Sequence, residues 1–313
     1  MTEPAEPQRI TPLRETLTEP QTELPRVTTG GEWGRYLRVF LTFARNSLIR
    51  DMTFRADFIF HCISSIAWTA MNVGFYLIIF RFTSMIGEDT GWGQDEFFLF
   101  LATVWFINSL VQAFFMPNAN EFSELIRTGG LDFALLKPID TQFLISFRRI
   151  EWSALSNFAV GLLIAGISLH SLATREEAAF YPTPLSLLLY GFFVGCGVAI
   201  MYSVMICLAA TSVWLGRNQS LYDFWFYITN FSRYPMEIYN TPLGRPLLGL
   251  FTFVVPVLVV VNVPARILAR PLDPRADWEL PLAVWACVAT FGCVMFSRWL
   301  FRHSLKSYRS ASS

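Results

Sequence analysis

Few residues of this 313-residue chain form a sequence pattern that is typical of a catalytic, metal-binding or nucleotide-binding site. His61, His170 and His303 lie far apart on different segments, so they do not form a set of metal ligands. The sequence contains no GxxxxGK[ST] phosphate loop, no HExxH motif and no GxSxG motif. The five cysteines lie in apolar stretches without a CxxC pair, which is typical of small buried hydrophobes. We therefore expect no catalytic residue, no metal and no bound cofactor on this chain.

The most informative segment, residues 117–138, is polar and lies between two apolar runs. Its pattern predicts a short amphipathic helix over residues 120–127, because apolar side chains recur at i, i+3 and i+4. A pair of glycines follows, and we expect it to form the C-cap of this helix. A helix held between two membrane spans can act as a lever for another protein, and the alternative is a plain connecting loop. The residues concerned are apolar Phe122, Leu125 and Ile126, polar Glu121, Glu124 and Arg127, and the capping Gly129 and Gly130.

The elements that position this segment are membrane spans. The chain is 53% hydrophobic and only 15% charged, whereas soluble domains carry about 25% charged residues. A span needs about 20 apolar residues. The sequence therefore predicts an all-α membrane protein with six transmembrane helices, over residues 56–80, 96–116, 143–169, 185–215, 247–263 and 281–301.

The flanking segments complete the predicted topology. Residues 1–30 contain no apolar signal-peptide core, so we expect a disordered tail there, followed by one transmembrane domain over 31–309 and a short tail over 310–313. Residues 33–55 predict a basic amphipathic helix at the membrane interface, with an ordinary solvated helix as the alternative. The aromatic stretch 221–239 contains three charged residues, so we expect it at the membrane surface or packed into the protein.

The basic residues predict which side of the membrane each segment faces. Of the 24 Lys and Arg, 19 fall on inside segments and 5 on outside segments if the N-terminus is cytoplasmic. This bias places both termini in the cytoplasm. Arg233 and Arg245 are counted inside, and Arg266 outside, in a last outer loop that begins at Pro264.

Two sequence blocks resemble a known family. Residues 124–138, ELIRTGGLDFALLKP, look like the cytoplasmic signature of ABC-2 type permeases, the membrane subunits of ATP-binding-cassette exporters. A second block, NFSRYPMEIY over 230–239, with FVVP over 253–256 and VPA over 263–265, resembles a subgroup of uncharacterised bacterial six-span permeases. The resemblance covers about residues 33–309.

The resemblance implies a partner and a role for the cytoplasmic helix. In this family the helix after the second span is a coupling helix that docks on a separate ATPase subunit. ATP-Mg would then bind to the partner, and two permease chains, alike or different, would form the pathway in a bacterial inner membrane. The apolar spans favour export of a hydrophobic or amphipathic substrate, with no role for nucleic acid. A channel or scaffold without ATP coupling is one alternative, and a membrane-embedded lipid or glycan transferase is another.

Overall fold

The computed structural model describes residues 32–87, 90–175, 181–215, 226–269 and 279–308. The chain divides into two units, residues 1–38 and 39–313, and each is described by itself. The described part of the first unit, residues 32–38, is the start of helix α1 (Glu32–Thr53). There the Arg38 side chain donates a hydrogen bond to the carbonyl of Gly34 (3.2 Å). The tails predicted over 1–30 and 310–313 lie outside the described residues.

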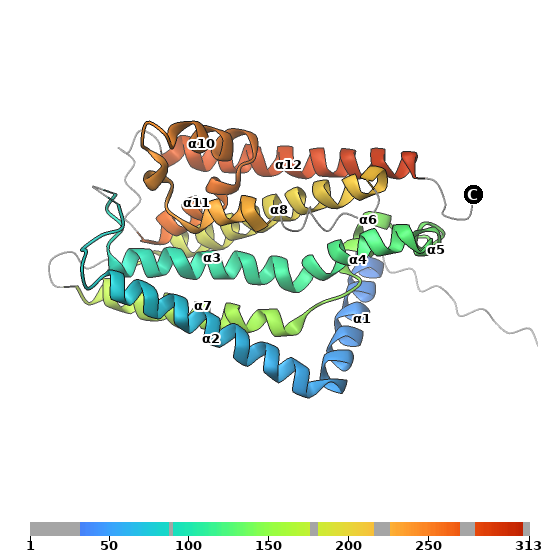
Figure 1. Ribbon diagram of the computed structural model, residues 1–313, viewed down its shortest axis with the longest axis horizontal. Helices are drawn as coiled ribbons and strands as arrows, with labels where there is room; N and C mark the ends of the chain where they lie inside the picture. Colours follow the sequence, from blue (N-terminus) through green and yellow to red (C-terminus); the bar gives the residue numbers. More distant parts are fainter. Residues whose placement is uncertain (1–31, 88–89, 176–180, 216–225, 270–278, 309–313) are drawn as a thin grey trace, which may run out of the picture. The chain divides into compact units, whose positions relative to one another are not determined.

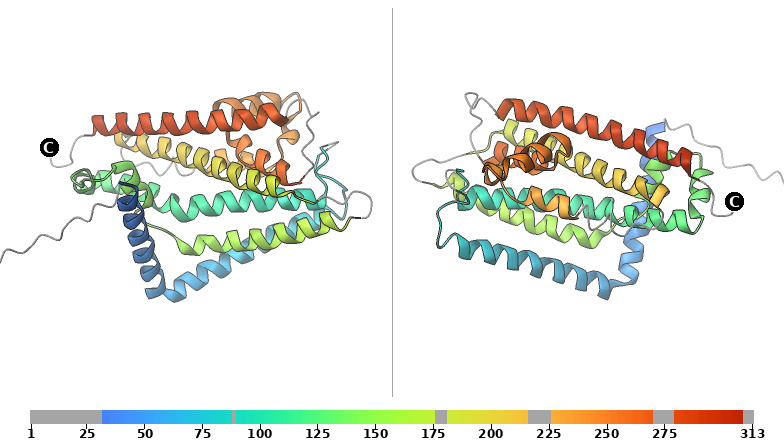
Figure 2. Two further views of the ribbon diagram at one scale, coloured as in Figure 1. Left: turned by 180° about the vertical axis from the view of Figure 1, so that it is seen from behind. Right: turned by 45° about the horizontal axis from the view of Figure 1, so that its top comes forward.

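The second unit is helical, without strands in its described residues (Figures 1 and 2). After α1 come α2 (Arg55–Ile79), α3 (Gln94–Phe114), α4 (Met116–Arg127), α5 (Gly130–Leu135) and α6 (Thr141–Phe147). A 3₁₀ turn, η1 (Trp152–Ala154), leads into α7 (Leu155–Ala173), which is followed by α8 (Pro184–Leu215). The last part contains η2 (Phe231–Arg233), η3 (Met236–Tyr239), α10 (Arg245–Gly249), the π-turn η4 (Leu250–Val254), α11 (Val257–Ala269) and α12 (Glu279–Ser307).

The long helices run between two ends of this unit, which Figure 1 separates clearly. Helices α4, α5 and α6 lie at one end, together with the last turns of α8 and α12; we call it the α4 end. There the hydroxyls of Ser123 and Ser212 are 2.9 Å apart. The opposite end, here called the far end, holds the start of α3 and the short helix α10. At the far end Ser171 of α7 donates to the carboxylate of Asp95 of α3 (2.8 Å).

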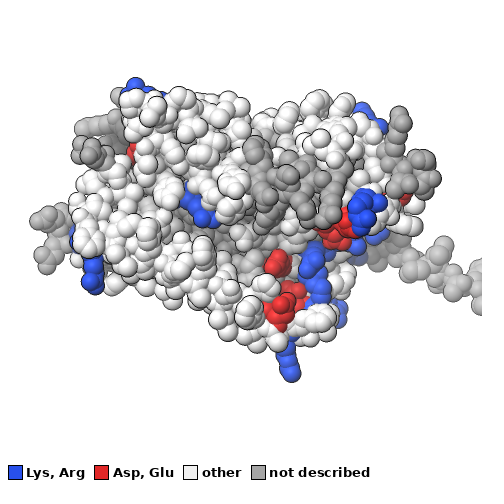
Figure 3. All heavy atoms as spheres, in the orientation of Figure 1, with Lys and Arg blue, Asp and Glu red and all other residues white. Residues whose placement is uncertain are grey.

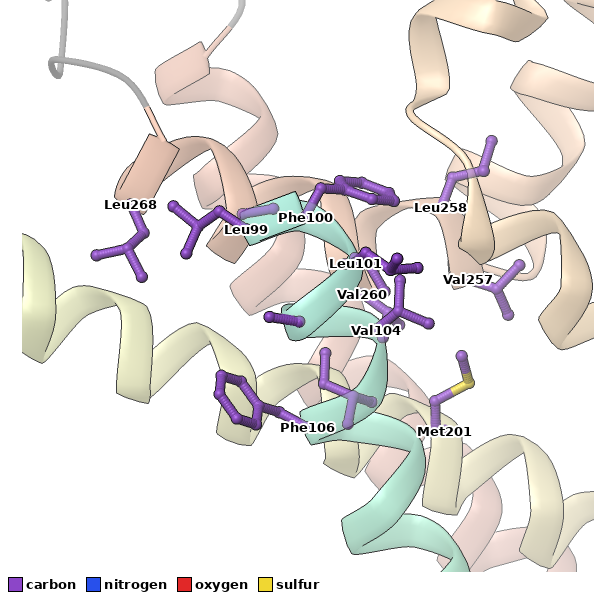
Figure 4. Close-up of a cluster of buried hydrophobic side chains, with 14 of the residues drawn as sticks. Leu99, Phe100, Leu101, Val104, Phe106, Met201, Val257, Leu258, Val260 and Leu268 are labelled. Carbon is purple, nitrogen blue, oxygen red and sulfur yellow. The ribbon is translucent and has the colours of Figure 1, made fainter. Parts of the chain in front are cut away.

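Helices α3 and α11 form the centre of the core. All 13 residues of α11 are buried, and Figure 4 shows its side chains against those of α3 and Met201 of α8. The approach of α8 to α11 depends on Gly197, because a Cβ added there would lie 2.8 Å from the carbonyl oxygen of Val260. Helices α2 and α12 are mostly exposed although apolar, which is typical of helices that face lipid.

Five helices are long and apolar enough to cross a membrane, and a bent helix pair raises the number to six if it counts as one span. The predicted spans 56–80 and 185–215 match α2 and α8 closely, and the span at 281–301 lies within the longer α12. The second span, 96–116, matches α3 to within two residues at each end, and Pro117 lies in the first turn of the next helix, α4, where its fixed φ and missing N–H are tolerated.

The prediction for the third span is wrong at its start. Residues 141–147 form the separate helix α6, and the spanning helix begins only at Trp152. The chain between them is irregular and carries Arg148 and Arg149, both exposed. Two adjacent guanidinium groups favour water over the apolar environment, so the apolar run of α6 does not continue into α7.

The predicted fifth span, 247–263, is not one straight helix. Helices α10 and η4 on one side and α11 on the other are bent by 88° at a break around Pro256. Pro264, predicted to begin an outer loop, lies inside α11. Helix α10, which begins at Arg245, lies at the far end, so Arg245 is not on the same side as Arg127, with which it was counted inside (Figure 1).

The described part of the stretch predicted over 221–239 is packed into the protein. Residues 226–230 are helical, and Ile228, Thr229 and Ser232 are buried. Ser212 lies at the α4 end, whereas Ile238 lies near Gly87 in the turn after α2, at the far end. The chain therefore changes ends between Ser212 and Ile238, before the bent pair begins.

Candidate functional site: a polar slot and the α4 end

A cavity of about 720 Å³ lies between α2, α3 with the start of α4, the η1–α7 junction and residues 226–234. Its lining is largely polar, although every helix that forms it is apolar overall. We call it the polar slot. It is lined by His61, Ser64, Ser65, Trp68, Thr69, Asn72, Tyr76, Leu101, Val104, Trp105, Asn108, Ser109, Gln112, Met116, Pro117, Asn120, Glu151, Ser153, Ala154, Asn157, Phe226, Thr229, Arg233 and Tyr234.

Helical spacing explains how two apolar helices line a polar slot. The lining positions on α2 recur every three or four residues from His61 to Tyr76, and those on α3 and α4 do so from Leu101 to Asn120. Each set therefore forms one stripe along one helix face. At a rise of about 1.5 Å per residue, the stripes are roughly 22 Å and 28 Å long. The slot thus extends over most of a hydrocarbon core about 30 Å thick.

Some polar groups of the slot are satisfied within the protein. Thr69 donates to the side-chain oxygen of Asn157 (3.0 Å), and Asn72 donates to the carbonyl of Trp68 (2.8 Å). Within the part of the chain that the structure describes, the side chains of Asn108, Gln112 and Asn120 make no hydrogen bond to protein. The slot therefore offers free donors and acceptors along its length.

The charged groups of the slot lie toward its two ends. Glu151 is at the α4 end, where its N–H donates to the carbonyl of Ala113 (2.9 Å). Arg233 lies toward the far end beside Tyr76, with its guanidinium 5.6 Å from the centre of the Phe226 ring. The stretch between these ends is lined by neutral amides, hydroxyls and aromatic rings.

The second candidate region is the α4 end, where the sequence-predicted residues lie. Phe122 is completely buried against Phe301 of α12, with ring centroids 5.7 Å apart, and Leu125 and Ile126 pack beside it, partly buried. Their shared face therefore points into the chain itself. Gly129 follows α4 with φ +72°, the left-handed conformation that favours glycine after a helix, and Gly130 begins α5.

The polar side chains of α4 point outward. Glu124 and Arg127 form an exposed ion pair, with the Arg127 Nε donating to a Glu124 oxygen (2.8 Å). This hydrogen bond and the carboxylate charge raise the pKa of Arg127 further above its usual value. Glu121 pairs with Arg148 of the irregular segment before η1 (3.3 Å). The polar face of α4 is therefore solvated and partly linked to its neighbour.

One buried side chain ties α4 to that segment. Asn118 is 3% exposed and donates to the carbonyls of Ser146 (2.9 Å), Arg149 (2.7 Å) and Phe114 (2.8 Å). It also accepts from the N–H of Arg149 (2.8 Å). We call this the Asn118 joint. It fixes the start of α4 to the end of α6, so that displacement of one carries the other.

The same segment is held from its other side by α1. Ser47 accepts from the N–H of Ile150 (3.0 Å), and Arg50 donates to the carbonyl of Ile150 (3.2 Å). The Trp152 indole donates to the carbonyl of Ala44 (3.3 Å). Residues 148–152 therefore connect α1, α4 and the start of α7.

Helix α5 carries apolar side chains that nothing in the described chain covers. Phe133 is 73% exposed and Leu136, directly after the helix, is 81% exposed. In Figure 3 the charged side chains gather toward the α4 end, while the face over the long helices is nearly free of charge.

The sequence interpretation overlooked the slot and the joint. The polar stripe of α2 shows a signal, because Ser65, Thr69 and Asn72 recur at helical spacing within an apolar run. Asn118 shows none, since its partners are the backbone groups of residues 28 and 31 positions away.

Comparison with known proteins agrees with this architecture. Searches of curated proteins and of solved structures give no match. The family model described as "ABC-2 family transporter protein" matches residues 66–312, which is most of the chain. Proteins of this family are membrane components of transporters and associate in general with an ABC ATPase. The chain therefore belongs to the ABC-2 family and is an integral membrane permease.

Proposed function

We propose that this chain is the membrane subunit of an ABC exporter, and that its α4 end receives the movement of a separate ATPase. The observation that carries the proposal is the combination of an exposed apolar tip, Phe133 and Leu136, after the end of α4 with the Asn118 joint at the start of the same helix. ATP-Mg would bind to the partner. Residues 31–309 would form one transmembrane domain, in a bacterial inner membrane.

Charge supports a cytoplasmic α4 end. Lys and Arg residues that flank spans favour the cytoplasm. At the α4 end they come from α4, the segments around α6 and the last turns of α12, and at the far end there are fewer. The first group is Arg127, Lys137, Arg148, Arg149, Arg298, Arg302 and Lys306, and the second is Arg81, Arg175, Arg233, Arg245 and Arg266. Both termini would then be cytoplasmic, and α1 would lie in the membrane interface.

The predicted coupling residues divide into two roles under this proposal. Glu121, Glu124 and Arg127 would make polar contacts with the ATPase. Phe122, with Leu125 and Ile126, would hold α4 against the chain's own core. A movement of the ATPase would then displace α4 together with the helices packed on it. We expected these three residues to make the apolar contact with the ATPase. Under this proposal Phe133 and Leu136, which are exposed, would make it instead.

The joint gives the push a route to the slot. A displacement of α4 moves residues 146–149 through Asn118, and the next residues, Glu151 and Ser153, line the slot. Nucleotide can favour the outward-open arrangement only by binding it better than the inward-open one. Through the joint, this difference in nucleotide affinity between the two arrangements would be coupled to the conformation of the transport pathway.

A second permease chain, alike or different, would complete the pathway. Gly191 and Gly195 lie on one face of α8, and no other described part of the chain comes within 4 Å of a Cβ added at either. The small-xxx-small pattern permits close approach of a neighbouring helix. This face of α8 is therefore open to a helix from another chain.

The test is recovery of the ATPase from native membranes. The full chain should co-purify with a nucleotide-binding partner, and the double variant F133E/L136E should lose it, because two buried apolar contacts become charged. The matched control is F82E, which changes an equally exposed phenylalanine (88%) at the far end and should keep the partner. The charge reversal E124R/R127E should retain ATP hydrolysis but lose transport.

A channel or scaffold makes the opposite prediction. In that case no nucleotide-binding protein is recovered with the wild-type chain, or F133E/L136E retains as much of it as F82E does. Either result would refute docking at α5.

A further inference from the structure

The part of α1 in the second unit lies crosswise to the spans. Figures 1 and 2 show residues 39–53 passing across the direction of α3 and α12 at the α4 end. Helix α2 begins at Arg55, directly after the single turn residue Phe54, and it is a candidate span. A helix with this placement follows the membrane surface, and α1 and α2 form a corner there.

One face of α1 is apolar and exposed. Its large side chains recur at helical spacing, and each is between 41% and 55% exposed. The same surface continues past the corner through Phe54 and along α2, whose apolar span is mostly exposed. Because lipid acyl chains surround a helix of this kind, they are in reach of the surface on α1 as well. We call this surface the outer face of α1; it consists of Leu41, Leu48, Ile49 and Met52.

Two exposed arginines accompany the outer face. Arg45 lies four residues after Leu41 and four before Ile49, so helical spacing places it on this face. Arg55 begins α2 at the corner. Within the described chain, neither guanidinium makes a hydrogen bond or an ion pair to protein. Such a side chain can lie along an apolar surface while its charged group reaches the phosphates of the lipid headgroups.

The other charged residues near the corner leave a net positive charge there. Arg50 and Asp51 pair with each other (3.1 Å). Asp57, in the first turn of α2, has a carboxylate oxygen 3.6 Å from a ring nitrogen of His61. A phospholipid with a net negative charge therefore suits the corner better than a zwitterionic one.

The opposite face of α1 holds the segment beside the polar slot. Ser47, which is buried, accepts from the N–H of Ile150 (3.0 Å), and Asp51 accepts from the N–H of Trp152 (3.3 Å). Glu151 lies between these two residues and lines the slot. Because both faces belong to one helix, a contact that fixes the outer face also fixes the hold on this segment.

We propose that the outer face of α1 binds anionic phospholipids of the surrounding leaflet, and that this binding steadies residues 150–152 beside the slot. The apolar side chains would contact the acyl chains, and Arg45 and Arg55 would bind the phosphates. The proposal goes beyond the proposed function, because it names a lipid partner and lets membrane composition act on the transport pathway. It takes from that function only the placement of α1 at the membrane interface.

The first test measures the preference for an anionic lipid. The purified full-length chain is exposed to equal amounts of phosphatidylglycerol and phosphatidylcholine, and the bound lipids are counted by native mass spectrometry. Each arginine near an anionic surface favours binding by about fivefold, so we expect R45Q/R55Q to lower the preference by about tenfold or more. R45K/R55K keeps both charges and should retain most of it. The matched control R81Q/R245Q removes two exposed arginines at the far end and should retain the preference.

The second test measures amide hydrogen exchange at residues 150–152. These N–H groups exchange when the hold by Ser47 and Asp51 opens. Replacing phosphatidylcholine by phosphatidylglycerol in nanodiscs should slow the exchange about fivefold or more in the wild type, and leave it unchanged in R45Q/R55Q. S47A removes the acceptor for Ile150, so it should bind phosphatidylglycerol as the wild type does but lose the slowing at Ile150.

Three results would overturn the proposal. Phosphatidylglycerol binds no better than phosphatidylcholine; or R45Q/R55Q and R81Q/R245Q lower the preference equally; or exchange at residues 150–152 is the same in both lipids. Loss of the ATPase from R45Q/R55Q with an unchanged lipid preference would also overturn it, and would assign the outer face to the ATPase. Recovery of the ATPase by the wild type is measured separately, so lipid binding by a chain that recovers no ATPase refutes the coupled function and not the lipid partner.

Discussion

Replacing Asn118 by leucine tests the joint that we place between α4 and α6. The leucine has the same branched shape and number of side-chain heavy atoms but strands the N–H of Arg149 and the carbonyls of Ser146 and Arg149. A buried polar group without a partner costs about 1–3 kcal/mol. Arg149 is exposed, so water reaches part of the site, and we expect the low end of the range, about 3 kcal/mol in total.

The assay is thermal unfolding of the purified full-length chain. In a domain of 150–250 residues 1 kcal/mol shifts Tm by about 2–4 °C, so about 3 kcal/mol should make N118L lower Tm by roughly 6–12 °C. The control is N120L, two residues further along, because Asn120 is exposed and makes no protein hydrogen bond in the described chain. Equal Tm values for N118L and N120L would refute the joint as a mechanical connection.

The remaining predictions concern packing, topology and pH. G197A should lower Tm, because its methyl group meets the α11 backbone and overpacking costs about 1–3 kcal/mol. G191A, with open space around the new methyl group, should not lower Tm, because alanine favours a helix interior over glycine by about 1 kcal/mol. A membrane-impermeant maleimide should label K137C only from the cytoplasmic side and R245C only from the opposite side; labelling of both from one side contradicts the assigned ends. Burial disfavours the charged form of Asp140, but the hydrogen bonds from the Phe143 N–H and the Arg298 guanidinium outweigh it and lower the pKa of this carboxyl. The ionised carboxylate therefore stabilises the fold above about pH 4, and this stabilisation is lost below that pH. D140N should remove the fall in Tm that acid produces.

A span could be predicted from the sequence where the length of one apolar run sets the two ends of the helix. Helices α2 and α8 begin and end within a residue or two of the predicted bounds, because each is a single apolar run between polar residues. The third span was placed too early, because the prediction passed over the exposed pair Arg148 and Arg149, which interrupts the apolar run after α6. The Asn118 joint, a contact across about 30 residues, helps to hold the irregular chain between the two helices and has no sequence signal.

The functional residues were harder to predict for the same reason. Phe122 has the sequence pattern of a surface contact on an amphipathic helix, yet Phe301, far along the chain, covers it completely. Conversely, no sequence pattern singled out Phe133, which the fold leaves bare. Helical periodicity shows which side chains share a face, but not which face another element covers.

Helix α11 constrains how the protein is made. Its 13 residues extend roughly 20 Å, too short to cross a membrane alone, and Arg266 within it opposes insertion into lipid. The surroundings that bury it include α12, which is synthesised later. During biosynthesis the side of α11 that faces α12, with Val259, Val263 and Ile267, therefore stays uncovered until α12 inserts. A nascent chain that stalls before α12 would leave this side open to quality-control proteases.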